Sequence, residues 1–260
     1  MPDVSLLSLF SGIGAYEKAL TNLNIPYSLK GFSEVDKFAV NSYTSRVSPK
    51  FMVSENVKSM QGKYEEELNK WIKILNNLGY NSIYFIRNAK EFGIPQQRSR
   101  FFMVSIRKDI KTFFNPANVS CEQKTPQLRE FLLDNPREKY DSSEKGLKYM
   151  NRKTRDGRTH WDFGHHCNSD GIAKALTANM HKGVPYGVIR DLDRRLTPLE
   201  CWRLQGFEDE DYHKAKQALE ETHYYGYDKT DKQMYKQAGN SICVPILENI
   251  LKELFSRGEE

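Results

Sequence analysis

The sequence predicts an α/β protein built on a parallel β-sheet that helices cover on both faces. Up to about residue 107, short apolar runs typical of buried strands alternate with segments whose apolar residues recur at helical spacing. The chain has 260 residues, of which 38% are hydrophobic and 28% charged, and its mean hydropathy is −0.70. These values exclude wholesale disorder and a membrane protein, and the length fits one large domain with a smaller insert.

The N-terminal half consists of strand–helix units. Residues 5–10 form an apolar run that ends in a glycine turn, 11–14, and apolar residues then recur at helical spacing up to Leu23. A strand over 27–32 ends close to Glu34. The elements expected after it are a helical segment at 38–43, a strand at 51–54 closed by 55–57, a helix at 68–78 ending at Gly79, and strands at 83–86 and 100–106.

The C-terminal half divides into an irregular part and a helical part. From about 108 to 189 prolines and polar residues interrupt every pattern, which indicates an inserted small domain. Thr197, Pro198 and Glu200 then form a helix start with a capping box, in a helix that ends at Gly206, and the last helix carries Leu247 to Leu254 on one face. We therefore expect a main domain of residues 1–107 and 233–260, and an insert with its connector over 108–232.

Positive charge is concentrated in one segment. Lysine and arginine total 39 against 34 acidic residues, a net charge of +5. Within residues 145–158 there are six basic residues and one aspartate, with Tyr149 among them. Such a segment either contacts phosphates of a nucleic acid or is a solvated face, and the composition leaves both open. The candidates for phosphate contact are Lys145, Lys148, Arg152, Lys153, Arg155 and Arg158.

The cysteines indicate a reducing compartment. Cys121, Cys167, Cys201 and Cys243 are scattered and include no CxxC pair, so neither a disulfide framework nor a four-thiolate zinc site is predicted. The His165–His166–Cys167 cluster lacks zinc spacing, and we expect no metal. The start of the chain has no basic segment followed by a long apolar one, so we expect a cytoplasmic protein.

The first glycine turn suits an adenosine-type cofactor. Gly12 and Gly14 let backbone N–H groups approach a ligand closely, and Glu34 at the end of the second strand is placed to accept hydrogen bonds from ribose hydroxyls. An ordinary turn between strand and helix is the alternative. The dinucleotide fingerprint requires a third glycine where this chain has Glu17, so a cofactor other than NAD is favoured and a nicotinamide-dependent oxidoreductase is disfavoured.

Six segments in order resemble the motifs of the DNA cytosine-C5 methyltransferases, and together they span nearly the whole chain. They are FSGIGA at 10–15, EVD at 34–36, ENV at 55–57, PQQRSR at 95–100, RLTPLECWRLQGF at 195–207 and QAGNS at 237–241. Residues 175–178 and 181–183 also resemble the end of the family's target-recognition region. The resemblance implies a Rossmann-like methyltransferase sheet with an inserted target-recognition domain, as in restriction-modification and phage enzymes.

The resemblance also assigns roles to individual residues. It implies S-adenosylmethionine as cofactor and double-stranded DNA as partner, with a cytosine flipped into the pocket. Glu55 matches the glutamate at N3 of that cytosine and Arg98 the arginine that steadies the ring, with Gln96 and Arg100 as supports. The residues implied to hold the cofactor are Phe10, Gly12, Gly14, Glu34, Asn240 and Ser241.

One part of the family pattern is missing. The family's nucleophile lies in a Pro-Cys-Gln loop between the ribose-binding glutamate and the Glu-Asn-Val segment, but the 20 residues between Glu34 and Glu55 contain no cysteine. A further strand–helix–strand step needs about 30 residues, so two strands of the family sheet cannot be present. Either the sheet closes, with 51–54 beside 6–10, or a gap leaves unpaired edges. The cost of unsatisfied backbone groups favours closure.

The chain therefore resembles a methyltransferase that lacks its nucleophile. None of the four cysteines follows a proline at the end of a strand. Three possibilities remain: an enzyme completed by a partner chain or by unexpected use of Cys121 or Cys167, a non-catalytic DNA- and cofactor-binding protein, and an internally deleted remnant. We expect no methyl transfer by this chain alone.

Overall fold

A computed structural model describes residues 4–9, 14–33, 49–122, 124–163, 166–224 and 229–255. The chain folds into two compact units. The first comprises Met1–Asn88, Ser99–Glu122 and Pro245–Glu260, and the second comprises Ala89–Arg98 and Gln123–Val244. These units begin and end at other residues than the boundaries expected near 108 and 232. That residues 108–232 act as a target-recognition domain stays a prediction.

The first strand–turn–helix unit is present. Strand β1 (Val4–Leu9) pairs in parallel with β2 (Tyr27–Ser33), and helix α1 (Ala15–Asn22) connects them. The helical segment expected at 38–43 lies outside the described residues. Residues 4–33 thus form the strand–helix–strand unit predicted from the glycine turn and the helical periodicity.

The second sheet of the first unit has the order β3-β6-β4, with β3 (Phe51–Val57), β4 (Tyr80–Asn88) and β6 (Ser99–Arg107). β6 is antiparallel to both neighbours, so β3 and β4 run in the same direction, joined by α3 (Glu65–Asn77). The α/β class is confirmed, but the expectation of an entirely parallel sheet is wrong. Only residues 89–98 join β4 to β6, fewer than the dozen or so that a parallel crossover needs.

The two sheets stay separate. Among the described residues β1 pairs only with β2, and β3 pairs only with β6. Closure of the sheet, with residues 51–54 beside 6–10, was the favoured expectation, and it is wrong. Among the described strands, β1 and β3 are therefore edge strands of their sheets.

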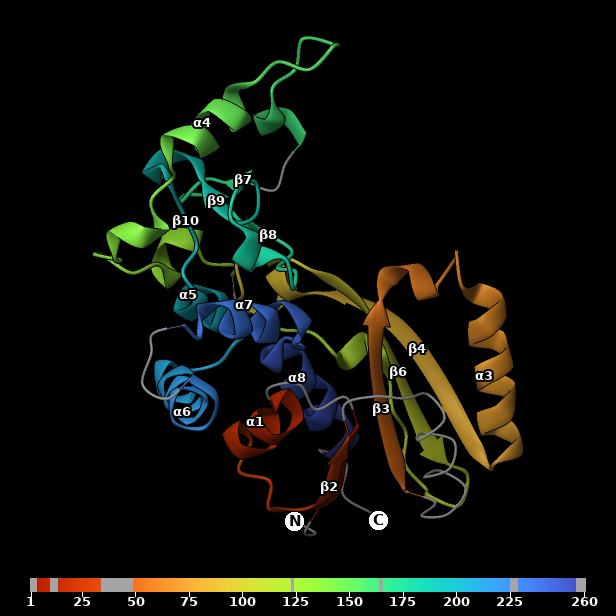
Figure 1. Cartoon of the computed structure of the whole chain (residues 1–260). Coiled ribbons are helices and arrows are strands. Elements are labelled where there is room, and N and C mark those ends of the chain that lie inside the picture. Colours follow the sequence, from red (N-terminus) through yellow and green to blue (C-terminus); the bar gives the residue numbers. More distant parts are fainter. Residues whose placement is uncertain are drawn as a thin grey trace. The chain divides into compact units, whose positions relative to one another are not determined.

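Helices cover both faces of the three-stranded sheet. On one face α3 buries Leu68 and Leu75 against Tyr80, Phe101 and Met103, as Figure 1 shows for the ribbons. On the other face the ring of Phe255, at the end of α8 (Val244–Phe255), meets the ring of Phe51 edge to face. The central strand β6 is consequently buried.

The second unit is mainly helical, with short strand pairs. The predicted capping box is present: Thr197 Oγ1 accepts from the Glu200 N–H, and Glu200 accepts from the Thr197 N–H. Its helices are α4 (Glu144–Asn151), α5 (Pro198–Arg203), α6 (Asp209–Leu219) and α7 (Asp231–Asn240). Its strands are β5 (Gln96–Gln97), β7 (His166–Cys167), β8 (Ala173–Lys174), β9 (Val188–Ile189) and β10 (Arg194–Arg195).

Single helical turns complete the described chain. The 3₁₀ turns are Lys58–Met60, Ala89–Phe92, Pro116–Asn118, Leu128–Phe131, Glu138–Tyr140, His160–Phe163, Met180–Lys182 and Arg190–Leu192, and Glu220–Tyr224 is a π turn. Within the described segments, no helix is long and apolar enough to cross a membrane.

Candidate functional site

In the first unit Glu55 forms an ion pair with Arg100. Glu55 lies opposite Phe102 in the β3–β6 register, so Arg100, two residues before Phe102, is a diagonal neighbour on the same face of the sheet. Arg100 Nε lies 3.0 Å from Glu55 Oε1, and the two side chains are 19% and 17% exposed. Burial lowers the pKa of Arg100, and the Glu55 carboxylate opposes that shift. A mostly buried carboxylate is thus held beside a cation at one end of β3.

The sequence-based assignment concerned contacts with the cytosine. Arg98 was expected to steady its ring, with Gln96 and Arg100 as supports, and these roles stay predictions. The structure gives Arg100 the contact with the carboxylate. The QxRxR spacing alone does not show which arginine reaches Glu55. The start of the strand does, because β6 begins at Ser99 and so contains Arg100 but not Arg98.

The start of α1 contacts the same strand. The Tyr16 hydroxyl donates to the Val53 carbonyl of β3 at 3.0 Å. Burial raises the pKa of Tyr16 well above its usual value, and the charges of Glu55 and Glu17 add to the shift. The Tyr16 phenol therefore stays neutral, as a hydrogen-bond donor beside Glu55.

Two features of the glycine turn are described. Gly14 adopts a left-handed conformation, φ 76°, and caps α1 without a side-chain hydrogen bond. One turn into the helix, Glu17 Oε2 is buried and has no hydrogen-bond partner among the described residues. Phe10, Gly12 and Glu34, the other cofactor residues expected here, lie outside the described residues. Within the described residues, the start of α1 thus has no side-chain cap from Gly14 and has a buried acceptor without a donor.

In the second unit Arg98 holds three backbone segments together. Its side chain is 2% exposed. Nη1 donates to the Leu176 carbonyl at 2.8 Å, and Nη2 donates to the carbonyls of Gly239 at 3.1 Å and Ser241 at 2.7 Å. These contacts join the PQQRSR, ALTA and QAGNS motifs through main-chain groups. Arg98 thus lies in a structural network, and its catalytic role stays a prediction.

Two glutamines extend this network. Gln96, fully buried, donates to the Leu204 carbonyl at 2.6 Å and accepts from the Leu176 N–H at 3.0 Å. Gln205, also fully buried, donates to the Ala238 carbonyl at 2.9 Å. Gln96 thus bonds main-chain groups through both of its amide atoms, and Gln205 adds a second donor to the Ala238 carbonyl, which also accepts from the Ser241 N–H.

The QAGNS segment packs closely at the end of α7. A Cβ atom built on Gly239 would overlap the backbone of Thr177, so only glycine allows this approach. Asn240, the last residue of α7, is exposed, whereas Ser241 is buried, and the Ser241 hydroxyl donates to the Ile242 carbonyl at 3.2 Å. The expected cofactor contacts of both residues stay predictions.

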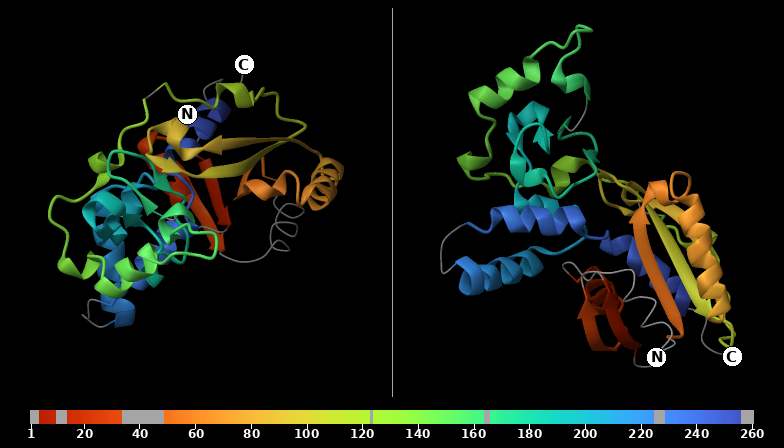
Figure 2. Two further views of the ribbon diagram at one scale, coloured as in Figure 1. Left: turned by 90° about the horizontal axis from the view of Figure 1, so that it is seen from above. Right: turned by 45° about the vertical axis from the view of Figure 1, so that its right-hand side comes forward.

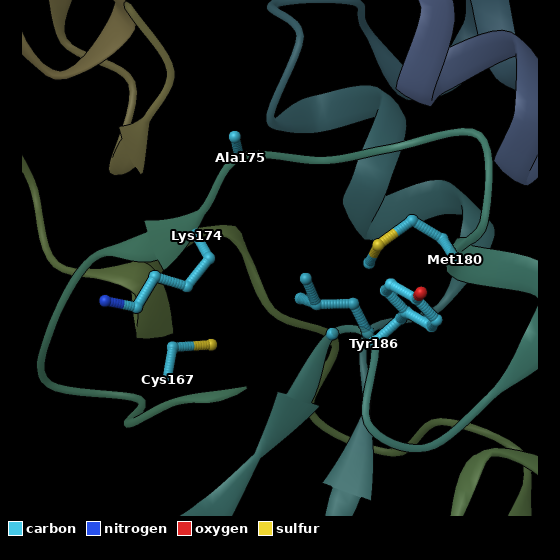
Figure 3. Close-up of a pocket in the computed structure, with 7 residues that line it drawn as sticks. Cys167, Lys174, Ala175, Met180 and Tyr186 are labelled. Atoms are coloured by element: carbon cyan, nitrogen blue, oxygen red, sulfur yellow. The ribbon is translucent and has the colours of Figure 1, made fainter. Parts of the chain in front are cut away.

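Three of the four cysteines are buried thiols of the second unit. Cys167 is 7% exposed, and Figure 3 shows its sulfur directed into a small pocket lined by Lys174, Met180 and Tyr186. Burial raises the pKa of Cys167 to about 12, and burial also raises that of Cys201. Such thiols stay protonated near neutral pH and are poor nucleophiles. Only the half-buried Cys121 belongs to the same unit as Glu55.

The basic segment forms an exposed hairpin after α4. A bridge joins Lys153 to Thr159, and all six candidate residues are exposed. In Figure 1 and the right-hand view of Figure 2, α4 and this hairpin lie at the end of the second unit away from α6. Lys148 pairs with Glu144 at 2.7 Å, and Arg158 pairs with Asp156. Hydrogen bonds from Thr154 and Arg158 lower the pKa of Asp156 to about 2, so the turn retains one negative charge.

No metal-binding cluster of three His, Cys, Asp or Glu residues occurs in the described part of the chain. His166 contacts the edge of the Trp161 ring, and its pKa is lowered by burial and then by Arg190 and Lys174. His165 lies outside the described residues. The histidines therefore contribute to packing in this unit.

A family model named C-5 cytosine-specific DNA methylase matches residues 44–256. The chain belongs to this family. The resemblance inferred from the motifs is confirmed, although the match starts beyond the glycine turn and Glu34.

Curated relatives show what the chain lacks. It is 33% identical over 217 residues to the type II methyltransferase M2.ScrFI of Lactococcus lactis subsp. cremoris, covering 80% of this chain but only 54% of the relative. It is 23% identical to the orphan methyltransferase M.SPBetaI of Bacillus phage SPbeta, in an alignment of 442 positions covering 98% of each chain. Because 442 exceeds 260 by 182, at least 182 of those positions have no counterpart in this chain.

Solved structures agree on the fold. The Dnmt2 methyltransferase of S. pombe superposes with a TM-score of 0.74 at 19% identity, covering 97% of this chain and 98% of that one. The Entamoeba histolytica methyltransferase EhMeth superposes with a TM-score of 0.68 at 16% identity over the full length of both chains. The fold is that of the Rossmann-like methyltransferases.

Proposed function

We propose that this chain binds S-adenosylmethionine and double-stranded DNA as a cytosine-C5 methyltransferase homologue but transfers no methyl group alone. The observation that carries this proposal is the absence of a cysteine between Glu34 and Glu55, together with the burial of Cys167, Cys201 and Cys243. A second candidate is the active enzyme, formed when a complementing chain supplies the thiolate. The separate sheets of the first unit favour it.

The described residues fit the cofactor. Gly14 offers no side-chain cap to α1, and the buried Glu17 oxygen, without a hydrogen-bond partner among the described residues, suits a hydroxyl or amino group. The residues proposed to hold the cofactor are Phe10, Gly12, Gly14, Glu34, Asn240 and Ser241. When bound, S-adenosylmethionine supplies an electrophilic methyl group, keeping the electron pair of the broken S–C bond.

The Glu55–Arg100 pair would supply the charge stabilisation of the family reaction, but not its nucleophile. In the family reaction a thiolate bonds to C6 of cytosine, C5 takes the methyl group, the C5 proton passes to solvent, and the C6–S bond breaks to return the thiolate. Glu55 beside N3 offsets the negative charge that builds on the ring, with Arg100 holding its carboxylate. Without sulfur addition C5 is a poor nucleophile, and no carboxylate replaces that step.

DNA binding is proposed for the exposed hairpin and α4. The hairpin and α4 expose six basic residues, of which two form ion pairs, Lys148 and Arg158. The other four are Lys145, Arg152, Lys153 and Arg155. Phosphate contacts of this kind make affinity depend steeply on salt. The hydrogen-bonded second unit favours a folded binding protein over a deleted remnant.

Trapping with a mechanism-based analogue tests the proposal. The chain is incubated with S-adenosylmethionine and duplex DNA containing 5-fluorocytosine, and covalent complexes are sought on a denaturing gel, with M2.ScrFI as the positive control. We expect no covalent complex with this chain. A complex abolished by Cys121→Ser would contradict the proposal and identify the nucleophile.

Salt-dependent binding tests the DNA contact. Arg152→Ala and Arg155→Ala should weaken binding to duplex DNA and lower the slope of log affinity against log salt by about 1 each. Lys214→Ala on α6, an exposed residue paired with Glu210, is the control and should leave the slope unchanged. An unchanged slope in the hairpin variants would remove this surface from the proposal.

A further inference from the structure

We propose that Arg195 is a binding site for a phosphate group, and that this phosphate belongs to the backbone of duplex DNA. The inference rests on the proposed function, because it adds a phosphate contact to a chain that we propose to bind DNA. Arg195 is the first residue of the RLTPLECWRLQGF motif and follows Arg194 in the short strand β10 of the second unit. Its guanidinium is held by two aromatic rings and meets no acceptor among the described residues.

Two tyrosine rings hold the guanidinium. Arg195 Cζ lies 5.8 Å from the ring centre of Tyr140 and 5.8 Å from that of Tyr235, distances at which a cation is attracted to the face of a ring. Both rings are buried, and each is fixed by its own hydroxyl. Tyr140 donates to Asp231 Oδ2 at 2.8 Å, and Tyr235 donates to the Leu196 carbonyl at 2.6 Å. The guanidinium is therefore ordered by groups that are themselves ordered.

The neighbouring arginine shows how the fold satisfies a structural guanidinium. Arg194 is 5% exposed and donates to both carboxylate oxygens of Glu200, at 3.0 and 2.9 Å. It also donates to the Leu133 and Arg195 carbonyls. Arg195 is half-buried, and its guanidinium forms no hydrogen bond or ion pair with any residue that the structure describes. Of two consecutive arginines, one thus has its acceptors within the fold and the other has donors available for a ligand.

The surroundings of Arg195 suit an anion. Main chain lies beside Nη1, where a Cβ atom built on Gly183 would be 3.4 Å away, and Gly183 has a left-handed φ of 75°. The preceding residue, Lys182, is exposed and forms no ion pair with a described carboxylate. Asp231, which accepts from Tyr140, is compensated by Lys139 at 2.9 Å. The local charge is therefore positive before a ligand binds.

The shape of the donor set favours phosphate, and its position favours a polymer. The donors of a guanidinium form a planar fork that matches two oxygens of a phosphate, and an arginine that is already ordered loses little entropy when it binds. A half-buried position lets the phosphate of a DNA backbone reach the fork from outside. Contacts with backbone phosphates fix the register and orientation of a protein on DNA without reading sequence. Arg195 is thus assigned to positioning of the duplex.

Nuclear magnetic resonance of the wild-type chain tests the site without requiring activity. Chain with isotope-labelled arginine is titrated with inorganic phosphate and, separately, with a short DNA duplex. The Nε–H signal missing from Arg195→Lys is that of Arg195. We expect this signal to shift with both ligands and to saturate at a lower concentration of duplex. A shift with inorganic phosphate alone would overturn DNA as the source of the phosphate, and a signal that neither ligand moves would overturn the site.

Variants measure the contribution to DNA binding. Arg195→Met should lower the affinity for duplex DNA about tenfold, the value of a charge-assisted hydrogen bond, and lower the slope of log affinity against log salt by about 1. Arg195→Lys keeps the charge but loses the fork, so it should lower the affinity and leave the slope near that of wild type. Lys214→Met also removes one positive charge, but from an ion pair of α6, and should change neither quantity. Equal affinity and slope in Arg195→Met and wild type, with both proteins folded by circular dichroism, would overturn the inference.

The outcomes separate this inference from the proposed function. If Arg152→Ala and Arg155→Ala lower the salt slope while Arg195→Met leaves it unchanged, the proposed DNA surface stands and the Arg195 site falls. If the wild-type chain binds no duplex DNA, the DNA-binding part of the proposed function falls and so does DNA as the ligand of Arg195. The response of the Arg195 signal to inorganic phosphate then decides whether the residue binds phosphate at all.

Discussion

The Arg98 network of the second unit and the Glu55–Arg100 pair of the first unit both come from family motifs, yet their surroundings differ. Arg98 donates to three main-chain carbonyls in a fully packed interior. Glu55 and Arg100 lie on a sheet whose edge strand β3 pairs, among the described strands, with β6. The first set of motif residues is fixed by hydrogen bonds to the main chain, and the second by an ion pair.

The contrast shows that family motif residues can be fixed by packing and main-chain hydrogen bonds, whether or not the chain transfers a methyl group. Gln96, Arg98 and Gln205 donate hydrogen bonds to main-chain carbonyls of neighbouring motif segments. Their presence gives a strong family match, but it is not a sign of methyl transfer. In the proposed function the chemistry needs both Glu55 and a thiolate, and no cysteine lies between Glu34 and Glu55.

The largest effect is expected for the buried ion pair of the second unit. Glu200 accepts from Arg194 Nη1 and Nη2 and from the N–H groups of Thr197 and Leu133. Glu200→Gln leaves a buried guanidinium without its counter-charge, and the free energy of unfolding should fall by about 3–5 kcal/mol in denaturant titrations. Glu210, which forms an exposed ion pair with Lys214, is the control. Glu210→Gln should lower the free energy of unfolding by less than about 0.5 kcal/mol. Equal losses of unfolding free energy in the two variants would mean that the buried ion pair does not stabilise the second unit.

Substitution of the two arginines sharpens the comparison directly. Arg98→Met leaves three buried carbonyls without their donor and should lower the free energy of unfolding by about 3 kcal/mol. Arg100→Met removes the counter-charge of the mostly buried Glu55 and should cost less, about 2 kcal/mol. Chemical denaturation of both variants measures the difference. A larger loss for Arg100 would reverse the structural roles given to these residues.

Gly239 tests the close approach of motifs in the second unit. Gly239→Ala places a methyl group against the Thr177 backbone and should cost about 1–3 kcal/mol, seen as a lower thermal midpoint. In Gly171→Ala the nearest atom, the Asn168 carbonyl oxygen, lies 3.4 Å from the added carbon, so this control should be nearly neutral. A neutral Gly239→Ala would show that the segments at 177 and 239 are not held together.

The smallest effect concerns the pH dependence of the Cys167 thiol. Its pKa rises from 9.0 to about 12 in the folded chain, because burial disfavours the thiolate. Above pH 9 the unfolded chain loses this proton and the folded chain keeps it, so the thiol's contribution to stability is full below pH 9 and falls as pH rises towards 12. Unfolding measured from pH 8 to pH 11 should depend less on pH in Cys167→Ala than in wild type. The same slope in both proteins would contradict a buried thiol.

Sequence reasoning predicted the elements better than their pairing. Periodicity placed α3 and its end at Gly79, and the Thr197–Glu200 capping box placed α5, because both are local patterns. Sheet closure was predicted wrongly, since the cost of an open edge depends on contacts such as the Tyr16 bond to Val53, which no local pattern contains. The pairing of Arg100 with Glu55 depends likewise on where β6 begins, one residue after Arg98.

Methyl transfer measured beside cofactor binding tests the central claim most directly. The chain is titrated with S-adenosylmethionine in a calorimeter, and the same preparation is incubated with labelled cofactor and cytosine-rich duplex DNA. The account predicts heat of binding and no label in the DNA. Label transferred to cytosine by the single chain would contradict it, and a nucleophile would have to be found among its four cysteines, with Cys121 the first to be replaced.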